Sequence, residues 1–470
     1  MIRRKNAEGT EHRKNKGVFS MLKVKGNKIY DENNKAVTLR GYNLGNWMLI
    51  EPNMMGTPGS ESRLKKAMAE YAGQEKTDYF FNQFLDAFLG EADIRFLSEL
   101  GCNSVRVPFN YRYFESDSRP FVYRDEGFRL LDRAVKLCKK YNIHVILDMH
   151  AVQGGQSLDW HCDNYLGEAR LYGDPLCQKR HLELWKHIAD HYKDEEIVAG
   201  YELLNEPVAE DDDQRAALNA IYKNVTGAIR EIDREHIIIL EGNDWSQNFE
   251  GMEEPFDDNL VYSPHYYTEC FSPVDDDPYK SGAYSREILE RQMDRRDEFI
   301  RKYNVPCWIG EFGIRNYKPY DIKRDILKDQ LGMFEQRGYS WCVWSYKDLS
   351  RRGVVHLNPE SPWAEFIKDI NKLKLRYNSD RSLPMTNPWD LSGLFRNSEA
   401  TDFVIPPDAV KSRLERDIRE SFSDILTKTF GRQFAALTLG DIDRLAESFR
   451  FENCIVRKEW MSVIKPFMGK

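Results

Sequence analysis

Two glutamates are the residues of this chain whose type and placement could do chemistry. Glu206 stands in an Asn-Glu-Pro motif and Glu311 in a Gly-Glu-Phe-Gly motif, and each follows a short apolar run. Two carboxyl groups that face one cavity can cleave a glycosidic bond, because one protonates the leaving oxygen while the other meets the cationic sugar carbon. Their mutual repulsion separates their pKa values, so that the protonated group acts as general acid and the ionised group as nucleophile.

A single glutamate at the end of a strand is more often a structural carboxylate in a salt bridge. Here, however, residues that can orient sugar hydroxyls lie beside the glutamates or at or just past the ends of other apolar runs: Arg106, His150, Asn205, His265, Tyr267 and Trp344. Their presence favours catalysis over a structural role for the two glutamates.

Eight short apolar runs predict the strands that position these residues. They lie at 37–43, 104–107, 144–149, 199–204, 237–241, 260–263, 307–310 and 341–344. Helical patterns separate them, as at 128–140, where apolar residues recur at helical spacing. Buried strands alternating with helices predict an α/β fold, a closed (β/α)8 TIM barrel whose catalytic side chains lie at the carboxyl ends of the strands. An open doubly wound sheet is the alternative, and it would need a glycine-rich phosphate turn that this sequence lacks.

The rest of the chain divides around this barrel. Residues 1–20 are polar and predict a disordered tail, and residues 21–374 predict the barrel, opened by a hairpin that caps its bottom. The connections 51–100 and 151–180 are long enough to be lids or binding walls. Residues 375–470 predict a linker and a helical appendage, which could pack on its own barrel, on a second copy or on another protein.

Charge and hydropathy exclude several classes of partner. The 470 residues include 68 Lys and Arg against 76 Asp and Glu, a net charge of −8, and 41% of the chain is apolar. This mild acidic excess gives no reason to expect a nucleic acid or an anionic membrane as partner, and no apolar run is long enough to span a bilayer. The oligomeric state cannot be read from the sequence.

The cysteines and the N-terminus favour a cytoplasmic protein. The eight cysteines are irregularly spaced and predict buried free thiols, although a bridge between Cys162 and Cys177 would suit a secreted protein. No secretory signal pattern occurs at the N-terminus. His187 and His191 stand four apart but lack the glutamate of a zinc-protease helix, so we expect no metal site and no cofactor.

The two motifs, in this order and with the residues around them, resemble glycoside hydrolase family 5, in the clan of retaining (β/α)8 glycosidases. The resemblance covers about residues 35–349. It implies that Glu206 is the acid/base, that Asn205 donates to the substrate 2-hydroxyl, and that Glu311 is the nucleophile.

The same resemblance assigns roles to five further positions. It implies that Arg106 and Tyr267 keep Glu311 ionised and that His265 lies close to Glu206. It also implies that His150 binds a sugar hydroxyl and that Trp344 forms the floor of the catalytic subsite.

Segments at or after the ends of the predicted strands indicate which kind of substrate the site could bind. The segment 40–47, Arg-Gly-Tyr-Asn-Leu-Gly-Asn-Trp, resembles the Arg-Gly-x-Asn-Leu-Gly-Gly-Trp of exo-β-1,3-glucanases and β-glucosidases in that family, with Asn46 in place of a glycine. A polar loop with Asp159 and Trp160 could close the cleft into a pocket. Glu51 could bind sugar hydroxyls there or pair with a lysine. Three tryptophans are candidate platforms for a sugar ring, although each could equally be a core residue: Trp47, Trp160 and Trp245.

These observations favour a retaining β-glycosidase that hydrolyses β-glucosidic bonds in oligosaccharides or glycosides by double displacement, with an exo mode of action. An endo-acting glucanase, cellulase or mannanase of the same family is the alternative. A barrel that binds carbohydrate without catalysis is a more distant one, and a metal-dependent hydrolase that uses His150 and His265 is the most distant. The sugar at the catalytic subsite and the linkage stay open.

Overall fold

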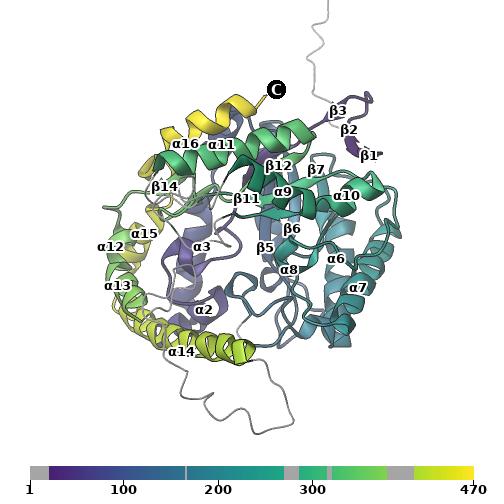
Figure 1. Ribbon diagram of the computed structural model, residues 1–470. Helices are drawn as coiled ribbons and strands as arrows, with labels where there is room; N and C mark the ends of the chain where they lie inside the picture. The colour runs from purple at the N-terminus through teal and green to yellow at the C-terminus, as the bar shows by residue number, and fades with distance from the viewer. Residues whose placement is uncertain (1–20, 165–166, 269–284, 315–319, 378–406, 470) are drawn as a thin grey trace, which may run out of the picture.

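The computed structural model describes residues 21–164, 167–268, 285–314, 320–377 and 407–469. Figure 1 shows a barrel of strands with helices around it. The predicted disordered tail at 1–20 and the linker at 378–406 lie outside the described residues.

A parallel sheet forms the centre of the fold. Its order is β10-β11-β12-β4-β5-β6-β7-β8-β9. The bounds are β4 (Arg40–Asn43), β5 (Ser104–Asn110), β6 (His144–Ala151), β7 (Val198–Glu202), β8 (Ile237–Glu241), β9 (Leu260–Ser263), β10 (His265–Tyr266), β11 (Trp308–Phe312) and β12 (Ser340–Val343).

The sheet closes on itself. Pro264 separates β9 from β10, and these two pieces occupy one strand position, because β9 pairs with β8 and β10 pairs with β11. A bridge between Tyr262 and Cys307 adds a further contact across the closure. The predicted (β/α)8 barrel is therefore confirmed.

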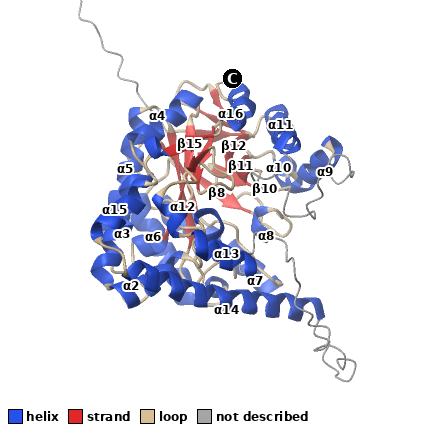
Figure 2. Ribbon diagram, turned by 90° about the vertical axis from the view of Figure 1, so that its left-hand side faces the viewer, coloured by secondary structure: helices blue, strands red, loops and turns tan. Residues whose placement is uncertain are grey.

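Helices cover the outside of the barrel (Figure 2). They are α4 (Glu91–Leu100), α5 (Asp125–Lys140), α6 (Pro175–Tyr192), α7 (Asp212–Arg230), α9 (Arg286–Arg296), α10 (Glu298–Tyr303) and α11 (Tyr320–Arg337), with the short α8 (Asn243–Ser246) after β8. The apolar stripe expected at 128–140 lies on α5 and is buried. Asp174 and Asp211 cap α6 and α7 by accepting backbone N–H groups, which fixes where these helices begin.

A small antiparallel sheet closes the bottom of the barrel. It consists of β1 (Lys23–Lys25), β2 (Lys28–Tyr30) and β3 (Ala36–Val37). Leu22 and Ile29 are buried against barrel residues such as Trp308, in the segment where the sequence predicted a hairpin cap. The first predicted strand, 37–43, divides in the structure, since its first residue pairs within this small sheet and 40–43 enters the barrel.

The C-terminal segment packs on its own barrel. It contains α12 (Pro362–Phe366), α13 (Lys368–Arg376), α14 (Pro407–Ala435), α15 (Leu439–Glu447) and α16 (Lys458–Ile464). Helix α14 lies along α2 (Glu61–Ala72), α15 along α3 (Gln74–Phe88), and α16 against α11 (Figures 1 and 2). Strand β15 (Cys454–Val456) pairs with β14 (Val355–Leu357), which pairs with β13 (Lys347–Asp348). A domain boundary at 375 stays a prediction, and that position lies inside α13.

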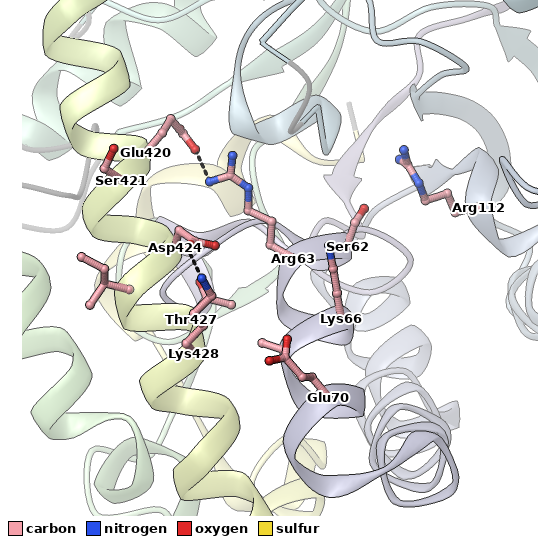
Figure 3. Close-up of a pocket in the computed structure, with 12 residues that line it drawn as sticks. Ser62, Arg63, Lys66, Glu70, Arg112, Glu420, Ser421, Asp424, Thr427 and Lys428 are labelled. Carbon is pink, nitrogen blue, oxygen red and sulfur yellow. Dashed lines mark hydrogen bonds and ion pairs between the residues drawn. The ribbon is translucent and has the colours of Figure 1, made fainter.

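The α2 and α14 helices approach closely at small residues. A Cβ on Gly431 would lie 2.7 Å from the carbonyl oxygen of Ala67, so only glycine fits there. Beside this contact the helices leave a polar groove of about 990 Å³ (Figure 3). Ion pairs from Arg63 to Glu420 and from Lys428 to Asp424 bridge or line it.

The cysteines of the described residues are free thiols, as predicted, and all but the half-buried Cys454 are buried. Cys270 lies outside the described residues. Within the described ranges, the helices are too short or too polar for any of them to traverse a bilayer.

Candidate active site

The two glutamates meet at the carboxyl end of the barrel. Glu311 is on β11, and Glu206 lies in the bend after β7 with a left-handed backbone angle, φ 43°. One carboxylate oxygen of Glu206 lies within 4.8 Å of one of Glu311. The strand ends thus bring together two carboxyl groups that are 105 residues apart, as the sequence predicted.

Glu311 is held by two donors. Nη1 of Arg106 donates to Oε1 over 2.6 Å, and the phenol of Tyr267 donates to Oε2 over 2.7 Å. Burial and the charge of Glu311 raise the pKa of Tyr267 well above its usual value, so the phenol keeps its proton and donates. Both expected partners of Glu311 are therefore in place.

Arg106 lies at the centre of a buried acidic network that was not predicted from the sequence. Besides Glu311, it binds three carboxylates: Asp148 at 3.1 Å, Glu202, and Glu241 at 3.1 Å. Burial lowers the pKa of Arg106, but the charges of these carboxylates raise it well above its usual value, so the guanidinium stays charged. Each of these carboxylates lies in a barrel strand, and the signal that could have revealed them was an acid inside an apolar run.

The side-chain amide of Asn205 has one hydrogen-bond donor that is not used within the described ranges. Its Oδ1 accepts from Nη2 of Arg106 over 2.8 Å, which orients the side chain. Its Nδ2 is buried and has no hydrogen-bond partner in the described part of the chain. Gln156 donates to the carbonyl oxygens of Asn205 and His150, at 2.8 and 2.7 Å, and so holds both segments. A buried amide donor without a partner suits a substrate hydroxyl.

Glu206 contacts two histidines. Nδ1 of His265 lies 2.8 Å from Oε1, and Nε2 of His161 lies 3.2 Å from Oε2. Burial raises the pKa of Glu206, but the hydrogen bond from His265 and the charges of His161 and His265 bring it below its usual value. Burial lowers the pKa of His265, but the charges of Glu241 and Glu311 and its hydrogen bonds raise it well above its usual value.

The pKa of Glu206 lies below its usual value, whereas the sequence predicted that Glu206 is the carboxyl group that stays protonated. The physical reason is the buried imidazole of His265, because an adjacent cation favours the charged form of a carboxylate.

Trp344 and His150 form one wall of the site. Their rings stack at 5.4 Å with 11° between the planes. The indole of Trp344 donates to the sulfur of Met54 over 3.1 Å, and a Cβ on Gly45 would lie 2.8 Å from the indole. His150 binds Asp148 through Nδ1 at 2.7 Å, and burial lowers its pKa well below the usual value, so the ring is neutral.

Comparison with known proteins decides the family. The family model described as Cellulase (glycosyl hydrolase family 5) matches residues 66–350. This chain belongs to glycosyl hydrolase family 5.

The family 5 enzyme also has relatives of known type. It is 34% identical over 461 residues to a beta-xylosidase of Phanerodontia chrysosporium, covering 93% of this chain and 96% of that protein, so the C-terminal helices fall largely within the shared region. It is 28% identical over 308 residues to endoglucanase C of Acetivibrio thermocellus, covering 57% of this chain and 87% of that protein. The crystal structure of an endogalactoceramidase superimposes with a TM-score of 0.55 at 20% identity, covering 76% of this chain and 78% of that one, and shows the same fold.

The loop residues of this family 5 enzyme divide into two groups. Trp47 is fully buried and its indole donates to the carbonyl oxygen of Leu85 over 3.0 Å, so it is a core residue and cannot be a sugar platform. Trp245 is 40% exposed, and its indole donates to Asp159 over 2.7 Å. Trp160 is half-buried and begins η2 (Trp160–Cys162). Two of the three candidate platforms thus remain available.

Another carboxyl group, that of Glu51, lies close enough to Glu311 and Glu206 for their charges to affect its pKa. Burial raises the pKa of Glu51 well above its usual value, the charges of Glu311 and Glu206 raise it further, and Arg352 lowers it. The charges of Glu206, Glu311 and Arg352 in the family 5 site therefore act on Glu51 as well.

The C-terminal helices hold the loop that carries Glu51. Nζ of Lys374 donates to the carbonyl oxygens of Pro52 and Thr57, each over 2.9 Å. Ser423 donates to the carbonyl oxygen of Pro58 over 2.6 Å. These bonds tie 52–58 of the family 5 enzyme to α13 and α14.

Proposed function

We propose that this family 5 hydrolase is a retaining β-glycosidase that releases one sugar from the non-reducing end of β-glucosides or β-linked oligosaccharides. The approach of Glu206 and Glu311, whose nearest oxygens lie within 4.8 Å, carries the proposal. Retaining enzymes hold their carboxyl groups about 5 to 5.5 Å apart, whereas inverting enzymes need about 6.5 to 9.5 Å for a water between them.

The first chemical step uses both carboxyl groups. Glu311 attacks C1 of the sugar, the bond from C1 to the glycosidic oxygen breaks, and Glu206 gives that oxygen a proton. Arg106 and Tyr267 each donate a hydrogen bond to Glu311 and so hold it in place for attack. Glu206 must carry a proton for this step, although its histidine neighbours hold its pKa below the usual value.

The second step returns the enzyme to its starting state. Glu206 takes a proton from water, the water oxygen bonds to C1, and the ester to Glu311 breaks. The Nδ2 of Asn205, unpartnered in the described part of the chain, can donate to the 2-hydroxyl of the sugar, and such a hydrogen bond would strengthen in both transition states. Two inversions at C1 give net retention.

Two contacts of the loops around the site support an exo mode. The first is the bond from Trp245 to Asp159, which joins the segments that follow β8 and β6. Glu51 lies near the catalytic pair on a loop braced by Lys374. A carboxyl group at the closed end of a pocket can bind the hydroxyls of a terminal sugar. These features favour a pocket over an open cleft.

Xylose is a second candidate for the released sugar. The observation in its favour is the 34% identity to a beta-xylosidase over nearly the whole chain. β-Xylosides present the same equatorial hydroxyls as β-glucosides and lack the hydroxymethyl group, so a pocket that accepts glucose has room for xylose. An endo mode is the other alternative, in view of the similarity to an endoglucanase.

Product analysis tests the proposal. Aryl β-glucosides, β-xylosides and β-mannosides should be compared alongside ladders of laminari- and cello-oligosaccharides. We expect hydrolysis of the glucoside, with monosaccharide as the first product from each ladder. Internal cleavage to mixed oligosaccharides would refute the exo mode, and tight oligosaccharide binding without hydrolysis would refute catalysis.

A further inference from the structure

Each carboxylate oxygen of Glu206 faces its own histidine, and the two histidines differ in their access to water. His265 approaches Oε1 and His161 approaches Oε2, at 2.8 and 3.2 Å. The side chain of His265 is 0% exposed and that of His161 is 10% exposed. Of the two histidines, only His161 therefore has some access to water, and the side chain of Glu206 is itself 13% exposed.

His265 is poorly placed to exchange its proton. Its Nε2 lies 3.2 Å from Glu241, and its Nδ1 lies 2.8 Å from Glu206 and 3.7 Å from Glu311. Three carboxylates around one buried imidazole stabilise the cation strongly. Releasing a proton held this way costs much free energy. His265 is therefore better suited to hold Oε1 of Glu206 in place than to provide the proton for the leaving group.

His161 is held close to Oε2 without being bound by other groups. Its Nε2 is buried and has no hydrogen-bond partner in the described ranges. The ring lies edge-to-face with Trp160, at 5.8 Å and 87°, and 6.3 Å from the ring of His150. Among the described residues, the Nε2 atom is thus held by no other group, and it lies within ion-pair distance of Oε2 of Glu206.

The backbone of His161 is anchored through Asp163. This buried carboxylate accepts from the backbone N–H of Ser62 over 2.9 Å, from the hydroxyl of Ser62, from Asn110 over 2.8 Å and from Arg112 over 3.2 Å. Ser62 and Arg112 lie at the groove beside α2 (Figure 3). Cys162 adds a bond to the carbonyl oxygen of Asp159 over 2.9 Å. These bonds fix the segment 159–163 that carries His161.

The charged groups that face this pair come from several elements. Glu206 meets His265 from β10, His161 from the loop after β6, and the carboxylate of Glu241 from β8, which accepts its backbone N–H over 2.7 Å. Glu311 on β11 adds a negative charge within 4.8 Å of one Glu206 oxygen. The neutral ring of His150 faces His161 and carries no charge that would oppose a cation there.

We propose that His161 is a catalytic residue that relays protons between solvent and Glu206. The proposal rests on the acid/base role of Glu206. In the first step, a proton moves from Nε2 of the His161 imidazolium to Oε2 of Glu206 and on to the glycosidic oxygen, while the C1–oxygen electron pair stays with that oxygen and Glu311 bonds to C1. In the second step, water gives its proton to Oε2 as its oxygen bonds to C1, the ester electrons return to Glu311, and the proton passes back to Nε2.

Dependence on the leaving group tests this role. For His161→Gln, we expect kcat/KM for an alkyl β-glucoside to fall about 10 to 100-fold, part of the effect of a general acid, and kcat/KM for 2,4-dinitrophenyl β-glucoside to fall less than about threefold. The reason is that dinitrophenolate departs without a proton. His191→Gln is the matched control, because His191 is an exposed helix residue that binds Asp132, and it should change neither value.

Added imidazole gives a second measurement. His161→Ala should regain activity on the alkyl glucoside with imidazole, whereas the wild type should not respond. An equal loss on both substrates, or the absence of rescue in a folded variant, would show that His161 only shapes the pocket and would overturn the relay.

Glu206→Gln on the same substrates separates the two hypotheses. If it loses activity on the alkyl glucoside selectively and His161→Gln does not, the relay fails and the acid/base role stands. If Glu206→Gln shows no dependence on the leaving group, the proposed function itself fails.

Discussion

Replacing Tyr267 by phenylalanine removes one hydrogen-bond donor to Glu311, the proposed nucleophile, and little else. The phenol donates to Oε2 of Glu311 over 2.7 Å, and its ring lies 4.8 Å from the guanidinium carbon of Arg352, a contact that phenylalanine can keep. A hydrogen bond to a charged group contributes about 1.5 to 3 kcal/mol, which corresponds to roughly 10 to 150-fold in rate. This bond weakens as Glu311 loses its charge in the first step and strengthens as the charge returns in the second. The loss should therefore fall on hydrolysis of the glycosyl-enzyme.

Pre-steady-state kinetics with 2,4-dinitrophenyl β-glucoside measures this effect. We expect kcat of Tyr267→Phe to fall by about 10 to 150-fold while kcat/KM falls much less, with a burst of phenolate and an enzyme mass increased by one glycosyl residue. Tyr266→Phe is the matched control, because the phenol of Tyr266 donates to the carbonyl oxygen of Leu289 and does not contact Glu311. Equal losses in kcat and kcat/KM without a burst would refute the reasoning.

Three further predictions follow from the same contacts. Glu311→Ala should abolish turnover, and azide should restore it with an inverted glycosyl azide as product; full activity without azide would exclude Glu311 as nucleophile. His265→Gln should move the alkaline limb of the plot of kcat/KM against pH to lower pH. The reason is that the pKa of His265 is raised, so that His265 and Glu206 together hold a proton to higher pH than Glu206 alone. An alkaline limb that stays in place would contradict a proton shared between these two residues. Lys374→Met should lower the free energy of unfolding by roughly 2 to 4 kcal/mol, measured in urea, and raise KM as the 52–58 loop loosens, since two charge-assisted bonds are lost; unchanged KM would show that the brace does not reach the pocket.

The barrel could be predicted because its strands are apolar runs of uniform type. Once eight such strands are closed into a barrel, their carboxyl ends must meet, which is why Glu206 and Glu311 could be paired across 105 residues. The pattern could not show that Pro264 divides the sixth strand, because a proline within an apolar run fits either a break or an edge.

The surroundings of the glutamates depended on contacts that a linear pattern does not encode. The segment that places His161 beside Glu206 is held by a hydrogen bond from Ser62 to Asp163, and Ser62 lies about 100 residues earlier in the chain. Trp47 is a core residue because its indole finds the carbonyl oxygen of Leu85, and nothing in its immediate sequence distinguishes it from an exposed platform such as Trp245. The pKa of Glu206 fell because of an imidazole placed by another strand.

The anomeric configuration of the first-formed product tests the central claim most directly. Proton NMR during hydrolysis of an aryl β-glucoside resolves the anomers before mutarotation mixes them. A double displacement at Glu206 and Glu311 predicts that β-glucose appears first and the α-anomer follows slowly. The α-anomer appearing first would mean a single displacement by water and would contradict the account.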